Sequence, residues 1–312
     1  MNLNGNSNII NRKKGQTLPQ ASGLITLNKS RDISERLIEI FFFICALFAV
    51  LSVAIITIYI FAKGIPAIVT IGLGDFVLGK VWKPMQDIFG IFPMIIGSVL
   101  ATIGAIIIGV PIGVLTAVFL AEIAPKRVAR IVQPAVELLA GIPSVVYGFF
   151  GLVVIVPMIS NYLGGPGNSL LAVNIILGIM ILPTIVNISL TSIRAVPSEY
   201  KEASLGMGAS HIQTIFKVVL PAARSGILTG IVLGIGRAIG ETMAVILVAG
   251  NTPAVPDSIL APIRTLTANI AMEMSYAFGL HQDALFATGV VLFAFIMFLN
   301  IIFSKLTSKV GD

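Results

Sequence analysis

Charged residues are scarce in this sequence. Only 11% of its 312 residues are Asp, Glu, Lys or Arg, against about 25% in typical soluble proteins. Hydrophobic residues make up 56%, and the mean hydropathy is +1.01. Because so few polar groups cannot cover the surface of a soluble protein of this size, the excess apolar residues must face lipid or one another. The composition excludes a soluble globular protein and indicates a protein with several membrane spans.

Several motifs are also missing. The single cysteine, Cys45, has no partner, which excludes an internal disulfide framework and a thiol metal site. The sequence contains no G-x-x-x-x-G-K-[ST] phosphate loop, so the chain cannot hydrolyse ATP by that route. The net charge is +6, but the basic residues form no stripe interleaved with aromatics, so we expect no nucleic-acid binding.

Six apolar stretches are long enough to cross a membrane, which takes about 20 helical residues for a hydrocarbon core of about 30 Å. They are residues 37–62, 93–120, 132–158, 169–189, 226–249 and 284–304. They are too long and too apolar for the alternating strands of a membrane barrel. No small-residue cleavage site follows the first stretch, so we expect it to be retained as an anchor. The predicted fold is all-α, a polytopic bundle of six transmembrane helices.

The basic residues are distributed unevenly around these spans. Fifteen of the 20 Lys and Arg residues fall in the two tails and in the segments between spans two and three and between spans four and five. Only Lys63, Lys80, Lys83 and Arg264 fall on the other side, and Arg237 lies inside a span. The positive-inside rule therefore predicts that both termini are cytoplasmic. In the external loop 63–90, Trp82 is expected at the depth of the lipid headgroups.

Small residues and prolines recur inside the spans. Glycines spaced four apart predict close packing of helix backbones: Gly109 and Gly113, Gly226, Gly230 and Gly234, and Gly236 with Gly240. A proline falls inside each of spans two, three and four, and each is expected to kink its helix: Pro111, Pro143 and Pro183.

Three ionisable residues lie within predicted spans: Glu137, Arg237 and Glu241. Each costs at least about 2.5 kcal/mol in hydrocarbon, so an inward-facing role is the default expectation. Arg237 and Glu241 are four residues apart and are expected on one helix face, although Arg before Glu is the less favourable order for a pair. One interpretation is a buried ion-pair network that fixes helix register. The other is that Arg237 offers its fork of donors to a passing oxyanion, oriented by Glu241 and Glu137.

The cytoplasmic loop 190–225 is more polar than a simple connection requires. Pro197-Ser198 predicts the start of a short helix, and Gly206 and Gly208 predict its end.

A second helix is predicted directly after it. Ser210 and Gln213 have the spacing of a capping box. The next residues have a helical apolar face that Pro221 is expected to close: Ile212, Ile215, Phe216 and Val219. Two short helices joined at glycine make a docking surface for a soluble partner.

The same loop carries a recognisable pattern: Glu202-Ala203-Ser204, then Gly208, then Leu220-Pro221. It resembles the EAA loop of bacterial ABC-importer permeases, with Ser204 in place of the third small residue. In that family the loop forms the coupling helix that fits a groove of the ATP-hydrolysing subunit. The resemblance therefore assigns ATPase coupling to these six residues.

Two further runs, residues 137–148 and 234–245, resemble the PstC-type permeases of phosphate-specific ABC importers, as do residues 82–97 and 250–252. The resemblance covers about residues 35–306. The sister PstA type shares the general scheme, but the Gly-Glu-Thr-Met-Ala-Val run of 240–245 is nearer to the PstC type. All three ionisable residues of the spans fall within the first two runs.

The resemblance implies a type I ABC-importer transmembrane domain that imports inorganic phosphate across a bacterial cytoplasmic membrane. It implies a transport subunit and not an enzyme, with no catalytic residue, metal or cofactor of its own, while partner subunits use ATP and Mg²⁺. The implied partners are a PstA-type permease, two ATP-binding subunits and an external phosphate-binding protein.

The predicted organisation has four parts. They are a disordered cytoplasmic tail (1–35), a first transmembrane helix with its external loop (36–92), the permease core with the coupling loop (93–306) and a cytoplasmic C-terminus (307–312).

Three alternatives stay open. An importer of another oxyanion, sulfate or molybdate, would keep the EAA loop. A secondary anion transporter would work without ATP and should show paired broken helices in two repeats. A membrane scaffold or sensor subunit would tolerate loss of Arg237 without a transport defect.

Overall fold

The computed structural model describes the backbone of residues 29–311 and the side chains of residues 35–302 and Lys305. Residues 1–28 of the predicted disordered tail lie outside the described part. The elements in chain order are α1 (Lys29–Ile71), α2 (Leu73–Leu78), β1 (Trp82–Lys83), η1 (Pro84–Gln86), β2 (Ile88–Phe89), α3 (Phe92–Val118), η2 (Phe119–Ile123), α4 (Lys126–Gly141), α5 (Ser144–Phe150), η3 (Gly151–Ile155), α6 (Val156–Leu163), α7 (Leu170–Arg194), α8 (Ser198–Gly206), α9 (His211–Thr214), η4 (Ile215–Val219), α10 (Leu220–Gly240), α11 (Met243–Val248), α12 (Leu266–Glu273) and α13 (Leu280–Gly311).

The chain divides into two units between Ile55 and Ile56, within α1. In the first unit, the helix exposes a continuous series of large apolar side chains, among them Phe41, Phe42 and Phe43. Such a surface suits contact with lipid acyl chains or with another membrane helix. The remaining elements belong to the second unit.

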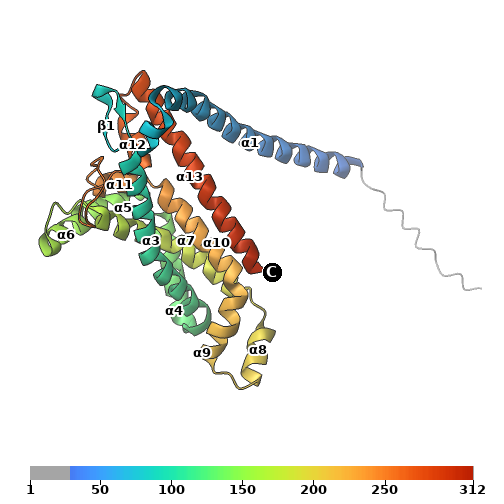
Figure 1. Cartoon of the computed structure of the whole chain (residues 1–312). Coiled ribbons are helices and arrows are strands. Elements are labelled where there is room, and N and C mark those ends of the chain that lie inside the picture. The colour runs from blue at the N-terminus through green and yellow to red at the C-terminus, as the bar shows by residue number, and fades with distance from the viewer. Residues whose placement is uncertain (1–28, 312) are drawn as a thin grey trace, which may run out of the picture. The chain divides into compact units, whose positions relative to one another are not determined.

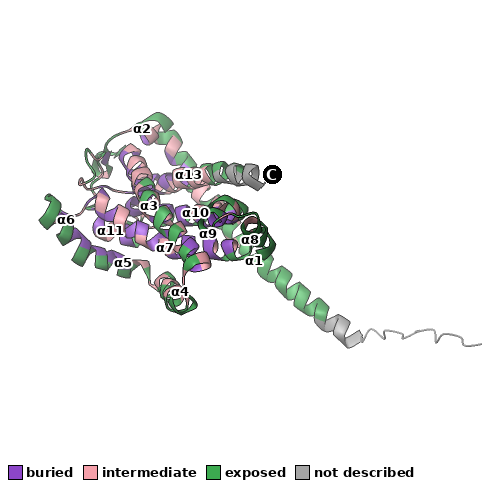
Figure 2. Ribbon diagram, turned by 90° about the horizontal axis from the view of Figure 1, so that it is seen from below, coloured by how far each residue is buried: buried purple, intermediate pink, exposed green. Residues whose placement is uncertain are grey.

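Helix α7 forms the core of the second unit. Its residues Val173, Ile176, Leu177 and Ile181 are almost fully buried, and Figure 2 shows it surrounded by α3, α5, α10 and α11. The long helices α3 and α10 make extensive contacts with it. This arrangement makes α7 the most buried of the six candidate spans.

Glycines bring α3 and α10 close to α7, as predicted. A Cβ atom added to Gly113 of α3 would lie 2.8 Å from Cγ2 of Ile185, and one added to Gly234 of α10 would lie 3.0 Å from Cγ1 of the same side chain. Gly236 and Gly240 behave differently, because no heavy atom of the described neighbours lies within 4 Å of an added Cβ. This second glycine pair lies on an open face of α10.

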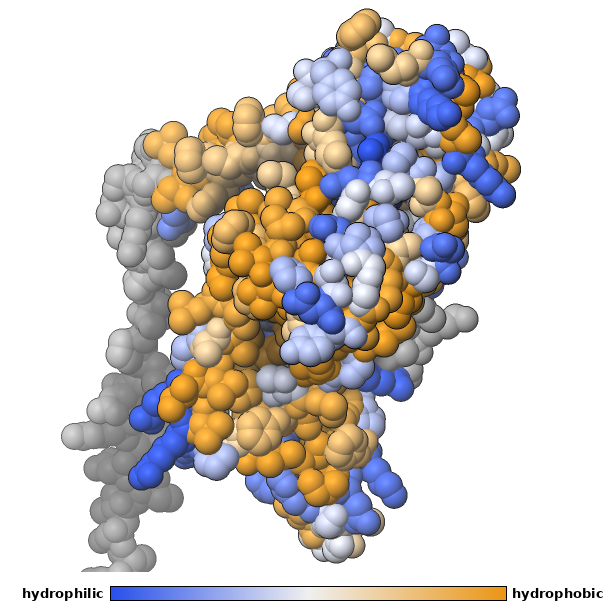
Figure 3. Space-filling view, turned by 90° about the vertical axis from the view of Figure 1, so that its left-hand side faces the viewer, coloured by the Kyte–Doolittle hydropathy of each residue, from blue (hydrophilic) through white to orange (hydrophobic). Residues whose placement is uncertain are grey.

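Within residues 29–311, six helical segments are long and apolar enough to cross a membrane, which confirms the predicted number. They are 35–71, 92–123, 144–163, 170–194, 211–240 and 280–302. On the face seen in Figure 3, hydrophobic side chains dominate the middle and hydrophilic ones gather toward the two ends. This distribution matches a protein that spans a bilayer.

The third span begins at Ser144 and not near residue 132 as predicted. Helix α4 ends at Gly141, and Pro143 precedes the first residue of α5. Pro143 therefore separates two helices, because its ring removes a backbone donor and fixes its φ angle. Pro111 and Pro183 lie inside the uninterrupted helices α3 and α7.

The two ends of the bundle carry different small elements. Figure 1 shows α12 and β1 at one end of α3, α7 and α10, and α8 and α9 at the opposite end. These are called the α12 end and the α8 end. At the α12 end, β1 and β2 form an antiparallel hairpin in which Trp82 pairs with Phe89. Trp82 is only 5% exposed, so its ring packs inside the protein at this end, and its depth in the membrane stays a prediction.

Candidate functional site

The predicted site begins on the open face of α10. Gly236 and Gly240 have open space beside them, and Leu233 on the same face is 52% exposed. Thr229, one turn before Leu233, is also exposed. The face thus combines small and polar residues with a single long apolar one, a composition better suited to a pathway or to another protein chain than to lipid.

Arg237 lies in the last turn of α10, beside this face, and is partly exposed. No hydrogen bond or ion pair joins it to another of the residues that the structure describes. Its positive charge acts on the hydroxyl of Tyr147 in α5. A guanidinium that is half-buried and leaves its fork of donors free is able to bind an anion in two-pronged fashion.

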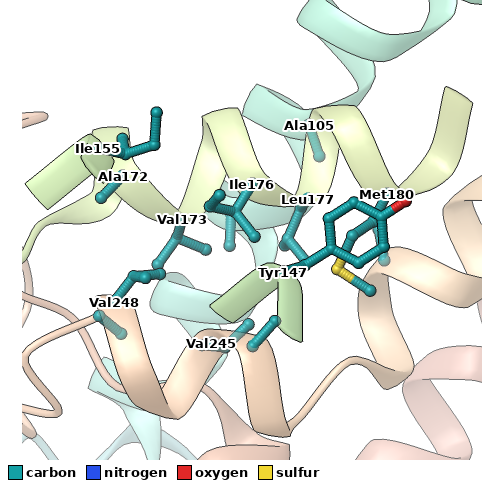
Figure 4. Packing of buried hydrophobic residues seen from close by; sticks show 14 of the residues in the cluster. Ala105, Tyr147, Ile155, Ala172, Val173, Ile176, Leu177, Met180, Val245 and Val248 are labelled. Atoms are coloured by element: carbon teal, nitrogen blue, oxygen red, sulfur yellow. The ribbon is translucent and has the colours of Figure 1, made fainter. Parts of the chain in front are cut away.

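Tyr147 holds the neighbouring helices in place. Its hydroxyl donates to the carbonyl oxygen of Leu139 at 2.7 Å, which joins α5 to the last turn of α4. Its ring is buried, and Figure 4 shows it beside Met180 of α7 and on the same side as Val245 of α11. Gly148 follows it, and a Cβ atom there would lie 2.7 Å from Cα of Ala244. This close approach of α5 and α11 fixes the wall next to Arg237.

Glu241 does not share a helix face with Arg237, because α10 ends at Gly240 and Glu241 has an extended backbone with φ −69° and ψ 132°. The expectation of one continuous helix over 226–249 is therefore wrong. The Glu241 carboxylate accepts a hydrogen bond from the backbone N–H of Ala244 at 3.2 Å, and its carbonyl oxygen accepts one from Thr267 at 2.9 Å. Glu241 thus stabilises the break and the start of α11, where a carboxylate is favourable.

Glu137 lies outside the six candidate spans, on α4, and is exposed. The expectation that it lies in hydrocarbon is wrong, because the break at Pro143 separates α4 from the third span. Its carboxylate accepts from Gln133 at 3.0 Å, and Gln133 in turn accepts from Arg194 of α7 at 3.1 Å. No hydrogen bond or ion pair between Glu137 and either Arg237 or Glu241 is present among the described side chains.

The loop at the α8 end has the predicted design. Helix α8 begins directly after Pro197, and α9 begins with the complete capping box of Ser210 and Gln213. Gly208 has a φ angle of +86°, a conformation that glycine adopts without strain. Glu202 and Ala203 are exposed, while Ser204 shares a hydrogen bond with Thr214 at 3.0 Å.

The predicted apolar face of the second helix is divided between two environments. Ile215 and Val219 are buried in the same cluster as the C-terminal part of α7, whereas Ile212 and Phe216 are 54% and 52% exposed. Further apolar residues of the loop are also exposed, and these form, with Ile212 and Phe216, the apolar patch of the α8 end: Tyr200, Leu205 and Met207.

Leu220 and Pro221 begin α10 and do not end a helix, contrary to expectation. The π-helical turn η4 precedes them, so α9, η4 and α10 form one continuous segment. In the first turn of a helix a missing proline N–H leaves no partner unsatisfied, and the wider π turn accommodates the ring.

Sequence reasoning missed two buried ionic contacts. At the α8 end, Lys201 of α8 pairs with Glu122 of η2 at 2.6 Å. At the α12 end, the Glu273 carboxylate accepts from Trp82 at 2.9 Å and from Arg264 at 2.6 Å, and lies 2.8 Å from Nε2 of His281. Lys201 and Glu122 lie 79 residues apart in the sequence. Arg264 and His281 lie only 9 and 8 residues from Glu273, but they stand outside α12, so helical spacing did not indicate their contact.

The contacts around Glu273 form a cluster of five side chains, here called the Glu273 cluster: Trp82, Arg264, Asn269, Glu273 and His281. Arg264 also donates to Asn269 at 3.0 Å and to the carbonyl oxygen of Asn251 at 2.8 Å. Next to the cluster, partial burial raises the pKa of the Tyr276 hydroxyl and the Glu273 carboxylate raises it further, while Arg264 opposes both. Tyr276 therefore stays neutral at physiological pH.

Comparison with known proteins matches most of this chain. A family model described as "Binding-protein-dependent transport system inner membrane component" matches residues 109–310. The "Probable ABC transporter permease protein YqgH" of Bacillus subtilis is 37% identical over 308 residues, 95% of this chain and 99% of that protein. The "Phosphate transport system permease protein PstC" of Mesorhizobium japonicum is 39% identical over 259 residues, 76% of this chain and 79% of that protein.

Solved structures share the fold. A chain of the MetNI methionine ABC transporter aligns with a TM-score of 0.56 at 18% identity, covering 74% of this chain and 99% of that one. A chain of a bacterial ABC transporter that imports alginate aligns with a TM-score of 0.57 at 18% identity, covering 87% and 99%. At this level of identity the likeness concerns the fold alone.

Proposed function

This chain belongs to the family of binding-protein-dependent transport system inner membrane components, and on that premise we propose that it is a permease subunit of an ATP-driven importer of inorganic phosphate. Relatives with 34–39% identity are phosphate transport system permeases. The observation that carries the substrate class is Arg237, a cation with free donors on an open helix face between membrane-spanning segments. Phosphate is the type of anion that a guanidinium binds through two parallel hydrogen bonds.

The proposed topology places the α8 end and both termini in the cytoplasm of a bacterial cell, and the α12 end outside. Lys126, Arg127 and Arg130 of α4, together with Lys201, Lys217 and Arg224, gather at the α8 end. Their charges satisfy the positive-inside rule in this orientation.

The proposed partners follow from the exposed surfaces. The apolar patch of the α8 end, with exposed Glu202 and Ala203 beside it, suits docking of an ATP-binding subunit, which performs the hydrolysis. The open face of α10 suits a second, PstA-type permease across the pathway. An external phosphate-binding protein delivers the solute to the α12 end.

The proposed mechanism is a two-state exchange. ATP binding draws the two ATP-binding subunits together and displaces α8 and α9, of which α9 is continuous with α10 through η4. ATP must bind one state better than the other for this to shift the equilibrium. Phosphate then meets Arg237 from the outside and leaves inward when the subunits reset. Tyr147 and Glu241 hold the walls around Arg237.

Reconstitution into proteoliposomes tests the proposal. The complex of this chain, a PstA-type permease and the ATP-binding subunits is supplied with ATP inside and with phosphate on its binding protein outside. We expect uptake to require ATP and to fall at least about tenfold in Arg237→Gln, the cost of a lost charge-assisted contact of roughly 1.5–3 kcal/mol. Arg237→Lys keeps the positive charge but loses the paired donors of the guanidinium. Its uptake should therefore lie between that of wild type and that of Arg237→Gln.

Thr229→Ala is the matched control, because Thr229 lies on the same open face and its hydroxyl bonds only within α10, to Ser225 at 2.9 Å. Unchanged uptake in Arg237→Gln would contradict the anion-binding role and favour a scaffold or sensor subunit. Competition by sulfate or molybdate in excess over phosphate would favour another oxyanion. Uptake without ATP would favour a secondary transporter.

A further inference from the structure

Helix α8 lies against α9 and η4 without burying any of its own residues. All nine of its residues are described, and none is buried. It lies between Pro197 and a glycine turn in which Gly206 and Gly208 have open space around them. Apolar packing therefore does not fix α8, although the proposed function requires its movement to reach the membrane spans.

Among the described side chains, one hydrogen bond and one ion pair join α8 to other elements. Ser204 bonds to Thr214, which ties α8 only to the adjacent helix α9. Lys201 pairs with Glu122, which belongs to the turn that continues α3. The ion pair therefore links α8 directly to a transmembrane helix.

The burial of Glu122 strengthens its ion pair with Lys201. Its side chain is only 7% exposed and that of Lys201 is 27% exposed. A carboxylate so deeply buried is costly without a partner, so the pair is strongly favoured over separation. Leu120 of the same turn is buried in the core next to Ile193 and Ile215. The carboxylate is thus anchored on the bundle and not on a mobile surface segment.

The π-helical turn Phe119–Ile123 adds to this argument. Such turns insert one residue into a helix and occur frequently at functional positions. Here the turn ends with the backbone N–H of Ala124 bonded to the carbonyl oxygen of Phe119 at 2.7 Å. It continues α3 and forms the last turn of the second span, directly before α4.

We propose that Glu122 is a positioning residue for energy coupling: through Lys201 it fastens α8 to α3, so that displacement of α8 by the ATP-binding subunit moves the bundle. This inference rests on the proposed function. Without the pair, α8 moves on its glycine turn while α3 stays in place. ATP hydrolysis then continues with less solute transported.

The test measures phosphate transported per ATP hydrolysed in the reconstituted complex. Glu122→Gln and Lys201→Met should each lower this ratio by at least about fivefold, the lower end of typical coupling between distant sites. The ATP-binding subunits should stay bound in both variants. The exchange variant Glu122→Lys with Lys201→Glu should restore the ratio to within about twofold of wild type, since it rebuilds the pair. Glu199→Gln, an exposed carboxylate on α8 itself, is the control and should leave the ratio unchanged.

Hydrogen exchange of the α8 amides in the full-length chain supplies a readout that needs no solute. We expect faster exchange of residues 198–206 in Glu122→Gln and wild-type exchange in the exchange variant. An unchanged ratio of phosphate transported to ATP hydrolysed in both single variants overturns the inference. This holds even if hydrogen exchange of the α8 amides becomes faster, because the ion pair then has only a structural role. If the wild-type complex carries sulfate and no phosphate, the proposed substrate is wrong, and the same ratio measured with sulfate still decides the role of Glu122.

Discussion

At the α12 end, one carboxylate forms hydrogen bonds or ion pairs with side chains from three separate segments. At the α8 end, the described side chains of the whole helix α8 make one ion pair and one hydroxyl hydrogen bond to other elements. Glu273 is 5% exposed, and its partners come from β1, from the segment before α12 and from α13. The α8 end instead exposes large apolar residues such as Met207, which is 90% exposed.

The difference shows how stability is divided in this molecule. Buried polar groups with several partners make the α12 end a rigid closure between elements that are distant in the chain. Elements that move in response to a partner come from the weakly attached parts of a protein. The α8 end has that character, so changes at the two ends should separate stability from partner binding.

The largest effect is expected from Glu273→Ala. The change leaves Arg264 and His281 without their carboxylate, and breaking a buried ionic contact in this way costs about 3–5 kcal/mol of unfolding free energy. Thermal or denaturant unfolding of the purified chain in detergent measures it. Asp257→Ala is the control, because Asp257 is an exposed carboxylate in the loop before α12. Equal stability of the two variants would show that the Glu273 cluster does not close this end.

A smaller effect is expected from Gly208→Ala. The φ angle of +86° strains any residue with a Cβ atom, so we expect a loss of about 1–2 kcal/mol. Gly206→Ala is the control, since Gly206 lies in the last turn of α8, has open space beside it and has no positive φ angle. Should Gly208→Ala unfold at the same denaturant concentration as Gly206→Ala, the positive φ angle at Gly208 would not require glycine.

The smallest effect on stability is expected from Ile212→Ala. Ile212 is 54% exposed, so its loss should change the unfolding free energy by no more than about 0.5 kcal/mol while weakening capture of the ATP-binding subunit. Ile215→Ala is the matched control: the same change three residues later, at a side chain that is 1% exposed, should cost about 2–5 kcal/mol. A titration of the ATP-binding subunit onto immobilised chain measures the binding. If Ile212→Ala binds the ATP-binding subunit as tightly as the wild-type chain does, the apolar patch of the α8 end is not part of the docking surface.

Local patterns were sufficient for some features of the fold. The length of the apolar runs predicted six spans, and the capping box of Ser210 and Gln213 predicted the start of α9. The glycines of α3 and α10 predicted close helix packing. Each of these features depends on a few residues that are near in the chain.

Other features depended on what surrounds a residue. Pro143 was expected to bend one helix, but it separates α4 from α5, which moves Glu137 out of the membrane span. Glu241 was expected on a helix face, but it ends α10 and caps α11. Proline and glycine-rich stretches permit either a bend or a break, and contacts such as that between Thr267 and Glu241 decide between them.

The sequence by itself determined the membrane environment, the number of spans, the start of the short helices α8 and α9 and the presence of an arginine among apolar residues. These follow from composition and local spacing, which hydrocarbon and helix geometry constrain directly. The tertiary structure alone decided that Arg237 has no hydrogen-bond or ion-pair partner among the described residues, and that Glu122 and Glu273 are largely buried carboxylates that join separate segments. Such pairings depend on which helices meet, and helix packing is set by many side chains together.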